Sequence, residues 1–96
     1  MTDDTISIRI EEGQDAAFVA ERGGERIGEL RIHRKPGAMT LVHTEVLPAG
    51  RGSGVGKKLV YAAVDFARAE HLKVLVLCPY AKTLFEREPA LRDVLA

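Results

Sequence analysis

Glycine occupies every second position in one short segment near the middle of the chain, at Gly50, Gly52, Gly54 and Gly56. The first turn of a helix carries unpaired N–H groups and a partial positive charge, which bind phosphate groups when no side chain blocks the backbone. Glycine removes that block, and a helical pattern begins directly after the segment. The segment therefore predicts a loop that holds the phosphates of a ligand at the start of a helix.

Two familiar glycine motifs do not fit this segment. The nucleotide P-loop G-x-x-x-x-G-K-[ST] needs a glycine where Arg51 stands and a hydroxyl residue where Lys58 stands. In the dinucleotide fingerprint G-x-G-x-x-G, the last glycine would fall on Val55 or Lys57. The segment therefore indicates neither a nucleoside triphosphate nor a nicotinamide dinucleotide.

Side chains that can move protons lie before and after this loop. His43 and Glu45 are two positions apart in a segment that alternates like a strand, so we expect them on the same face. Either could relay a proton, and a solvated or ion-paired face is the alternative interpretation. Cys78 follows an apolar run and could donate a proton, or it could be a small buried hydrophobe.

The chain before the loop has the pattern of an antiparallel meander. Apolar and polar residues alternate in successive segments, which are separated by turn residues such as Gly23-Gly24. The alternation breaks near Gly28, which could mark a bulge. The predicted strands cover residues 6–10, 16–21, 26–33 and 39–46.

The chain after the loop changes to a helical pattern. Apolar residues recur at helical spacing between residues 53 and 70, with polar residues on the opposite side. The apolar run of residues 74–77 predicts a strand buried on both faces, parallel to the fourth strand after a right-handed crossover. Residues 81–87 and 91–95 predict short helices interrupted by Pro89. The predicted fold class is α/β (α+β), a four-stranded antiparallel meander followed by a helix crossover to a parallel fifth strand and short C-terminal helices.

Length, charge and cysteine content limit the classes of protein. The chain has 96 residues, which suits a single domain over residues 1–96. Fourteen basic and fourteen acidic residues give a formal net charge of zero, so no global field favours nucleic acid or an anionic membrane. No apolar run is long enough for a membrane helix, and the three histidines lack metal-ligand spacing. A single cysteine and an acidic N-terminus predict a cytoplasmic protein.

The loop does match a third motif. Residues 51–56 read R-x-x-G-x-G, which resembles the acyl-CoA loop of the GNAT N-acetyltransferase superfamily. The resemblance extends over the preceding strand, the helix, the strand of residues 74–77 and the helix that follows. It implies a GNAT-like fold whose loop cradles the diphosphate of acetyl-CoA or coenzyme A. The cofactor-binding residues that it implies are Val46, Leu47, Arg51, Gly52, Ser53, Gly54, Val55, Gly56, Lys57, Cys78 and Tyr80.

The resemblance also implies catalytic roles. Family members often place a glutamate base on the fourth strand, which assigns that role to Glu45 with His43 as a second candidate. A tyrosine commonly serves as general acid where this chain has Phe85, which has no proton to give. Cys78, Tyr80 or water would then supply the proton.

The chain looks like a minimal member of the superfamily. Only residues 12–15 separate the first two predicted strands, where larger members have two helices, and two further strands of larger members have no counterpart. The acceptor site would then be open or completed by another subunit of a homo-oligomer. The expected reaction is acetyl transfer to a primary amine by direct attack on the thioester, with a protein lysine, a polyamine or a small metabolite as acceptor. The alternative is a catalytically inactive CoA-binding module or a protein-interaction module.

Overall fold

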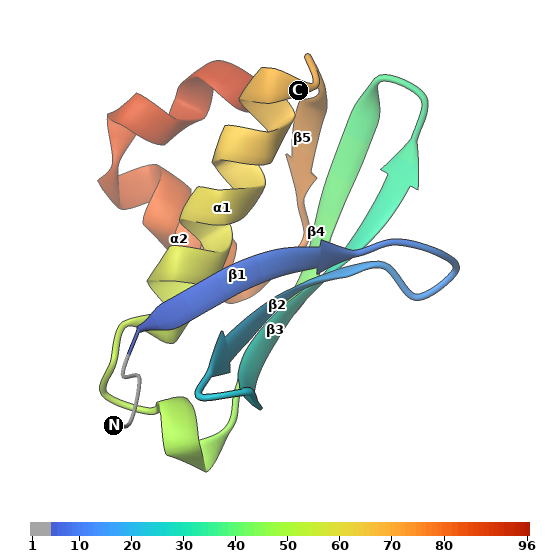
Figure 1. The fold of residues 1–96 in the computed structure, drawn as a ribbon. Coiled ribbons are helices and arrows are strands. Elements are labelled where there is room, and N and C mark those ends of the chain that lie inside the picture. The colour runs from blue at the N-terminus through green and yellow to red at the C-terminus, as the bar shows by residue number, and fades with distance from the viewer. Residues whose placement is uncertain (1–4) are drawn as a thin grey trace.

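The computed structural model describes residues 5–96, which form one five-stranded sheet with the order β1-β2-β3-β4-β5. The strands are β1 (Ile6–Glu11), β2 (Ala17–Arg22), β3 (Glu25–Lys35), β4 (Ala38–Val46) and β5 (Lys73–Val76). The first four pair antiparallel, and β5 pairs parallel to β4 (Figure 1). The predicted fold class, an antiparallel meander with a parallel fifth strand, is confirmed.

The helices cover one face of this sheet (Figure 1). The main helix α1 (Val55–Ala69) follows a short 3-10 turn, η1 (Pro48–Gly50), and α2 (Pro79–Arg87) follows β5. Pro89 begins a second 3-10 segment, η2 (Pro89–Val94), which confirms the predicted interruption. Within the described residues, no helix is long and apolar enough to cross a membrane. The core lies between the helices and the sheet and includes Phe18, Leu30, Leu41, Leu59, Val60 and Val64.

Gly28 allows α1 to approach the sheet closely. The register of β2 and β3 shifts between Ala20 and Glu21, next to this glycine, which confirms the predicted irregularity. A Cβ at Gly28 would lie 2.8 Å from Val55 Cγ1 and 3.1 Å from the carbonyl oxygen of Glu45. Because both distances are shorter than ordinary van der Waals contact, a larger residue would push the first turn of α1 off the sheet. This contact therefore fixes the position of the loop that precedes α1.

β4 contains a second irregularity, which the sequence did not indicate. Arg31 pairs with His43, but the next residue, Ile32, pairs with Leu41. Val42 is therefore an extra residue on β4 and forms a bulge. The bulge resets the alternation of side chains along the second half of the strand.

β5 is an edge strand that is buried on one face only. Val74 is buried, whereas Leu75 and Leu77 are 45% and 69% exposed. The predicted burial on both faces is therefore wrong. A continuous apolar run is typical of a parallel strand covered on both faces, but the helices of residues 5–96 all lie on one side of this sheet. Within these residues, the outer edge of β5 is paired only at Val74, which bridges to Leu95 and accepts a hydrogen bond from the N–H of Ala96.

Candidate functional site

The predicted phosphate loop connects β4 to α1 and contains two glycines in the left-handed region. Gly52 has a φ of 82°, and Gly54, the N-cap of α1, has a φ of 69°. A Cβ at either position would have no heavy atom within 4 Å, and no side chain of the described residues caps α1. These glycines are therefore required for the backbone conformation. Gly54, Val55 and Gly56 line an open concavity at this uncapped start of α1, as the binding of an anion to its N–H groups requires.

The other two glycines of the loop are required for packing. A Cβ at Gly50 would lie 2.7 Å from the carbonyl oxygen of Ile27, so this glycine lets the loop lie against β3. A Cβ at Gly56 would lie 3.0 Å from Cζ of Tyr80, so this glycine makes room for the phenol ring beside α1. One pair of glycines sets the conformation of the loop, and the other pair sets its position.

Arg22 holds the loop from β2. Its guanidinium donates hydrogen bonds to the Ser53 hydroxyl, at 3.2 Å, and to the carbonyl oxygen of Ala49. Because 31 residues separate Arg22 from Ser53, no spacing rule could have identified it from the sequence. Ser53 is thus a structural contact of the loop, with its hydroxyl oxygen accepting from within the protein.

β4 and β5 separate beyond Leu41, which opens a slot beside the loop. The N–H groups of Leu77 and Cys78 both donate to the Leu41 carbonyl, at 2.9 and 3.0 Å, and the parallel ladder ends there. The resulting slot has a volume of about 350 Å³. It is lined by Thr44, Val46, Gly50, Arg51, Gly52, Gly54, Val55, Gly56 and Tyr80. The loop and the slot therefore form one continuous site.

The backbone of Val46 points toward this slot. In an antiparallel ladder, residues that bond to the partner strand alternate with residues whose N–H and C=O point away. Leu47 donates to the Ile27 carbonyl of β3 at 2.9 Å, so the backbone groups of Val46 point to the opposite side, where β5 lies. The Leu47 carbonyl also accepts from the N–H of Gly50 at 2.8 Å. Of these two predicted cofactor contacts, Val46 faces the slot and Leu47 is engaged within the protein.

The two candidate proton donors after β5 have different surroundings. Cys78 is 2% exposed, and its Sγ lies 3.2 Å from Thr44 Oγ1. Tyr80 is half-exposed and lines the slot beside Gly56. Partial burial raises the pKa of Tyr80 above its ordinary value, so its phenol keeps the proton at neutral pH. Tyr80 lines the slot, whereas Cys78 packs behind it.

His43 and Glu45 lie on the open face of the sheet. They pair with Arg31 and Glu29 of β3, so they share a face as predicted, and both are exposed. Thr44, between them, points to the opposite face and lines the slot. An acceptor that meets Glu45 or His43 would therefore reach the slot from the uncovered side of the sheet.

A second concavity lies between α1 and α2 and shares Tyr80 with the slot. It has a volume of about 600 Å³ and is lined by Lys57, Tyr80, Thr83, Leu84, Arg87 and Glu88. Tyr61 donates a hydrogen bond to one carboxylate oxygen of Glu88, and Lys57 Nζ lies 3.9 Å from the other. The Tyr61 hydroxyl, followed by the charge of Glu88, raises the pKa of Lys57. Lys57 therefore faces this concavity, whereas Arg51 lines the slot.

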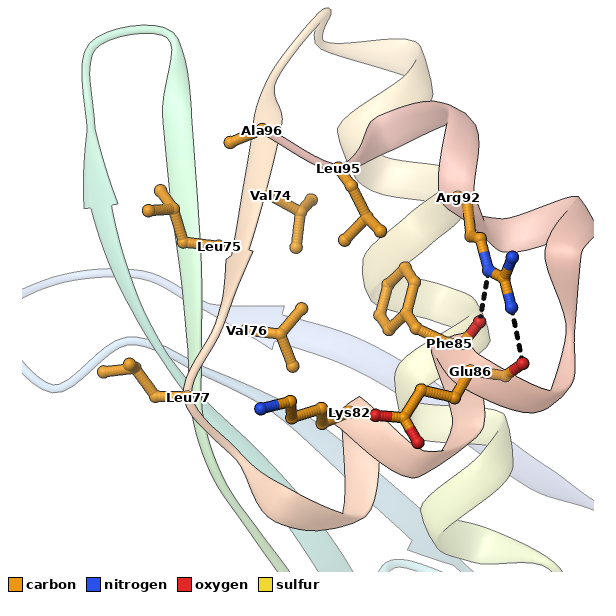
Figure 2. Close-up of a pocket in the computed structure, with 10 residues that line it drawn as sticks. All are labelled: Val74, Leu75, Val76, Leu77, Lys82, Phe85, Glu86, Arg92, Leu95 and Ala96. Carbon is orange, nitrogen blue, oxygen red and sulfur yellow. Dashed lines mark hydrogen bonds between the residues drawn. The ribbon is translucent and has the colours of Figure 1, made fainter.

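A third concavity is an apolar groove of about 450 Å³ at the outer edge of β5. Figure 2 shows Val76 pointing toward the Phe85 ring, whereas Leu77 points away from it. Arg92 joins η2 to α2 by donating to the carbonyl oxygens of Phe85 and Glu86. Phe85 is buried in this groove and does not line the slot, so its lack of a hydroxyl fits a packing role.

The fold and the site together define a class of protein. A glycine loop joins a meander strand to the main helix, and a slot opens where a parallel fifth strand leaves the sheet, which is the arrangement of a GNAT-like acyltransferase. The chain belongs to the GCN5-related N-acetyltransferase family, because the model described as "GCN5-related N-acetyl-transferase" matches residues 17–94. This match covers both the loop and the slot.

Several curated relatives carry the name Protein NATD1. The chain is 34% identical to the Mus musculus protein over 85 residues, which cover 88% of this chain and 67% of the relative. It is 33% identical to the Xenopus tropicalis protein over 90 residues, with coverages of 91% and 83%. It is 43% identical to the Homo sapiens protein over 74 residues, with coverages of 77% and 56%. The chain therefore corresponds to part of each relative.

Solved structures share the same fold. The solution structure of a GCN5-like protein from Staphylococcus aureus has a TM-score of 0.67 and 29% identity, and the match covers 92% of this chain and 87% of that one. A ribosomal-protein-alanine N-acetyltransferase from Brucella melitensis has a TM-score of 0.64 and 22% identity, with coverages of 78% and 62%. At the lower identity, the second likeness supports the fold alone.

Proposed function

We propose that this protein binds acetyl-CoA and transfers the acetyl group to a primary amine. Family membership supports acyl transfer in general. The observation that carries the finer proposal is the uncapped start of α1 behind Gly52 and Gly54, which opens into the slot beside Tyr80. The diphosphate of coenzyme A would fit at the loop, and its narrow pantetheine arm would fit in the slot.

The chain would hold the diphosphate of the cofactor by its backbone and by the charge of Arg51. The N–H groups at the start of α1 would bind the diphosphate, and Arg51 would add positive charge. Arg51 is exposed, lines the slot and makes no ion pair within residues 5–96. The backbone groups of Val46 would bind an amide of the pantetheine arm. The bound thioester supplies an activated acetyl group, and the chain supplies position and proton transfer.

Glu45 and His43 would act on the acceptor side. A lysine-type amine with a pKa of about 10.4 is roughly three units from half-neutral at pH 7, which costs about 4 to 5 kcal/mol. A base near the slot offsets part of that cost. Both side chains face the uncovered side of the sheet, and a water molecule could relay the proton to Glu45.

Tyr80 would protonate the leaving sulfur. In the reaction a C–N bond forms, the thioester C–S bond breaks, the nitrogen loses a proton and the sulfur gains one. Tyr80 lines the slot, and its raised pKa keeps the phenol protonated. Cys78 is the alternative donor, since its Sγ contacts Thr44, which lines the slot.

The acceptor would approach from the uncovered face of the sheet. The open face of the sheet would admit a protein lysine, a polyamine or a small metabolite, and a second subunit could complete the acceptor site. The single cysteine fits a reducing compartment such as the cytoplasm.

The test combines binding and turnover. Coenzyme A at about one hundred times its Kd should stabilise the fold by about 2.7 kcal/mol, and thermal unfolding should report this as a rise of several degrees. Acetyl-CoA with an amine panel should release free thiol, and Tyr80→Phe should slow that release without weakening the binding of coenzyme A. No thermal shift with millimolar coenzyme A or acetyl-CoA would refute the proposal.

The second candidate function is a CoA-binding module without catalysis. Phe85, at the position where the resemblance to the GNAT superfamily implies a tyrosine as general acid, is the observation that favours it. This alternative predicts the same thermal shift with coenzyme A and no thiol release with any amine.

A further inference from the structure

The concavity between α1 and α2 adjoins the slot at the site of the diphosphate. Tyr80 lines both of them, and the first turn of α1 contributes Gly56 to the slot and Lys57 to the concavity. A ligand whose diphosphate lies at the loop can therefore extend in two directions, into the slot on one side of the phenol ring and into the concavity on the other.

The concavity carries more positive than negative charge. Lys57 and Arg87 are its cations, and Glu88 is its only carboxylate. Tyr61 already donates to Glu88, and the Lys57 ammonium lies at 3.9 Å from that carboxylate, beyond a hydrogen-bond distance. Arg87 is exposed at the last turn of α2 and makes no ion pair within residues 5–96. One guanidinium and one ammonium thus flank a space of about 600 Å³, within the usual range for a small-molecule site.

We propose that Lys57 and Arg87 bind the phosphate monoester on the ribose of coenzyme A, so that the protein distinguishes coenzyme A from 3′-dephospho-coenzyme A. This inference rests on the proposed function, because it requires the diphosphate to lie at the loop. A phosphate monoester carries between one and two negative charges at neutral pH and accepts several hydrogen bonds. A guanidinium matches it in a bidentate manner, and an ammonium adds a point charge.

Tyr80 would separate the two ends of the ligand. Its ring lies against Gly56, where a Cβ would be only 3.0 Å from Cζ. The reactive arm would pass on the side of Thr44 and Val46, and the nucleotide would pass on the side of Lys57 and Arg87. Removing the 3′-phosphate would then change only the binding in the concavity and would not change the chemistry in the slot.

Isothermal titration of the full chain with coenzyme A and with 3′-dephospho-coenzyme A tests the inference. The wild-type protein should prefer coenzyme A by about tenfold or more at low salt, and the preference should shrink as ionic strength rises. Arg87→Gln should remove most of the preference while leaving the affinity for 3′-dephospho-coenzyme A unchanged. The matched control is Lys58→Gln, which removes an exposed cation of α1 that neighbours Lys57 in sequence but does not line the concavity, and it should keep the preference.

The outcomes separate the two proposals. Equal affinity of the wild-type protein for both ligands would overturn this inference and leave the proposed function standing. An equal loss of preference in Lys58→Gln and Arg87→Gln would also overturn it, because the effect would then come from the general field of α1 and α2. Failure of both ligands to bind would sink the proposed function itself. Thermal unfolding of each variant shows that it is folded before titration.

Discussion

The slot beside the glycine loop and the apolar groove at the edge of β5 are both lined by α2, but different parts of the chain form them. The slot is lined by glycines, by backbone and by the polar side chains of Arg51 and Tyr80. The groove is lined mainly by apolar side chains of β5, by Phe85 of α2 and by Leu95 and Ala96 after η2 (Figure 2). The groove is larger, at about 450 Å³ against about 350 Å³. The R-x-x-G-x-G segment nevertheless lies at the smaller slot. A phosphate group binds to free N–H groups, and the size of an apolar groove does not contribute to that binding.

This comparison separates stability from ligand binding. The buried side chains of the groove, such as Phe85 and Val74, belong to the core, so changes there should alter the free energy of unfolding. Gly52 and Gly54 of the loop have open surroundings, so side chains added there should alter the affinity for coenzyme A.

Phe85→Ala should give the largest loss of stability. Phe85 is 3% exposed, and truncating a buried phenylalanine typically costs about 3 to 5 kcal/mol. Urea denaturation should show this loss, while the folded fraction should bind coenzyme A with unchanged affinity. Leu77→Ser is the control, because Leu77 follows β5 and lines the groove but is 69% exposed, and it should change stability by less than about 0.5 kcal/mol. A large loss of affinity in folded Phe85→Ala would mean that the groove and the slot are coupled.

Gly54→Val should give the largest loss of binding. The new side chain would occupy the open space in front of α1, so we expect the affinity for coenzyme A to fall by about one hundredfold, or about 2.7 kcal/mol. Gly37→Val is a matched control, because Gly37 has a φ of 75° and equally open surroundings in the turn between β3 and β4. Both variants should lose similar stability from the left-handed backbone, and only Gly54→Val should lose binding. Titration calorimetry and thermal unfolding measure the two effects separately.

Arg22→Gln should have an intermediate effect on the loop. It removes the hydrogen bonds to Ser53 and Ala49, which should cost about 0.5 to 1.5 kcal/mol and weaken coenzyme A binding by several fold. Arg9→Gln is the control, since Arg9 makes its ion pairs on the open face of the sheet. If both variants bind coenzyme A as well as the wild type, Arg22 does not set the conformation of the loop.

Arg68→Gln should give the smallest effect, with a defined pH dependence. Arg68 donates to Asp93 Oδ1 at 2.7 Å and so joins α1 to η2, and this contact lowers the pKa of Asp93. A lowered pKa stabilises the fold above the unfolded pKa, and the contribution is lost as pH falls through the folded value. The variant should therefore lose more stability relative to the wild type near pH 7 than near pH 2, where the hydrogen bond from Arg68 to the Ala90 carbonyl still separates the two proteins. Denaturant titrations at both pH values test this, and an equal difference at the two pH values would contradict it.

The loop, the order of the elements and the periodic helix could be predicted because each depends on neighbouring residues. Gly52 and Gly54 are needed for local backbone geometry, and the apolar residues of α1 repeat at the helical period. The face of Thr44 could also have been predicted, since Thr44 lies between His43 and Glu45 and must point to the opposite side of the strand.

Other features could not be predicted because they depend on contacts between distant segments. Arg22 reaches Ser53 only when β2 folds beside the loop, and the bulge at Val42 appears only in the pairing of β3 with β4. The burial of β5 was predicted wrongly because an apolar run does not reveal how many faces of the sheet are covered. The catalytic roles of Glu45, His43 and Cys78 stay predictions.

The outer edge of β5 also affects how copies of this chain behave at high concentration. Lys73 and Leu77 direct their N–H groups to β4, so by alternation the backbone groups of Val76 point outward. An outward N–H and C=O beside exposed leucines can template the addition of a foreign strand. The short contact of Leu95 and Ala96 with Val74 shields the first part of that edge. Loss of this contact would leave all of β5 as an unpaired edge strand and favour aggregation during storage.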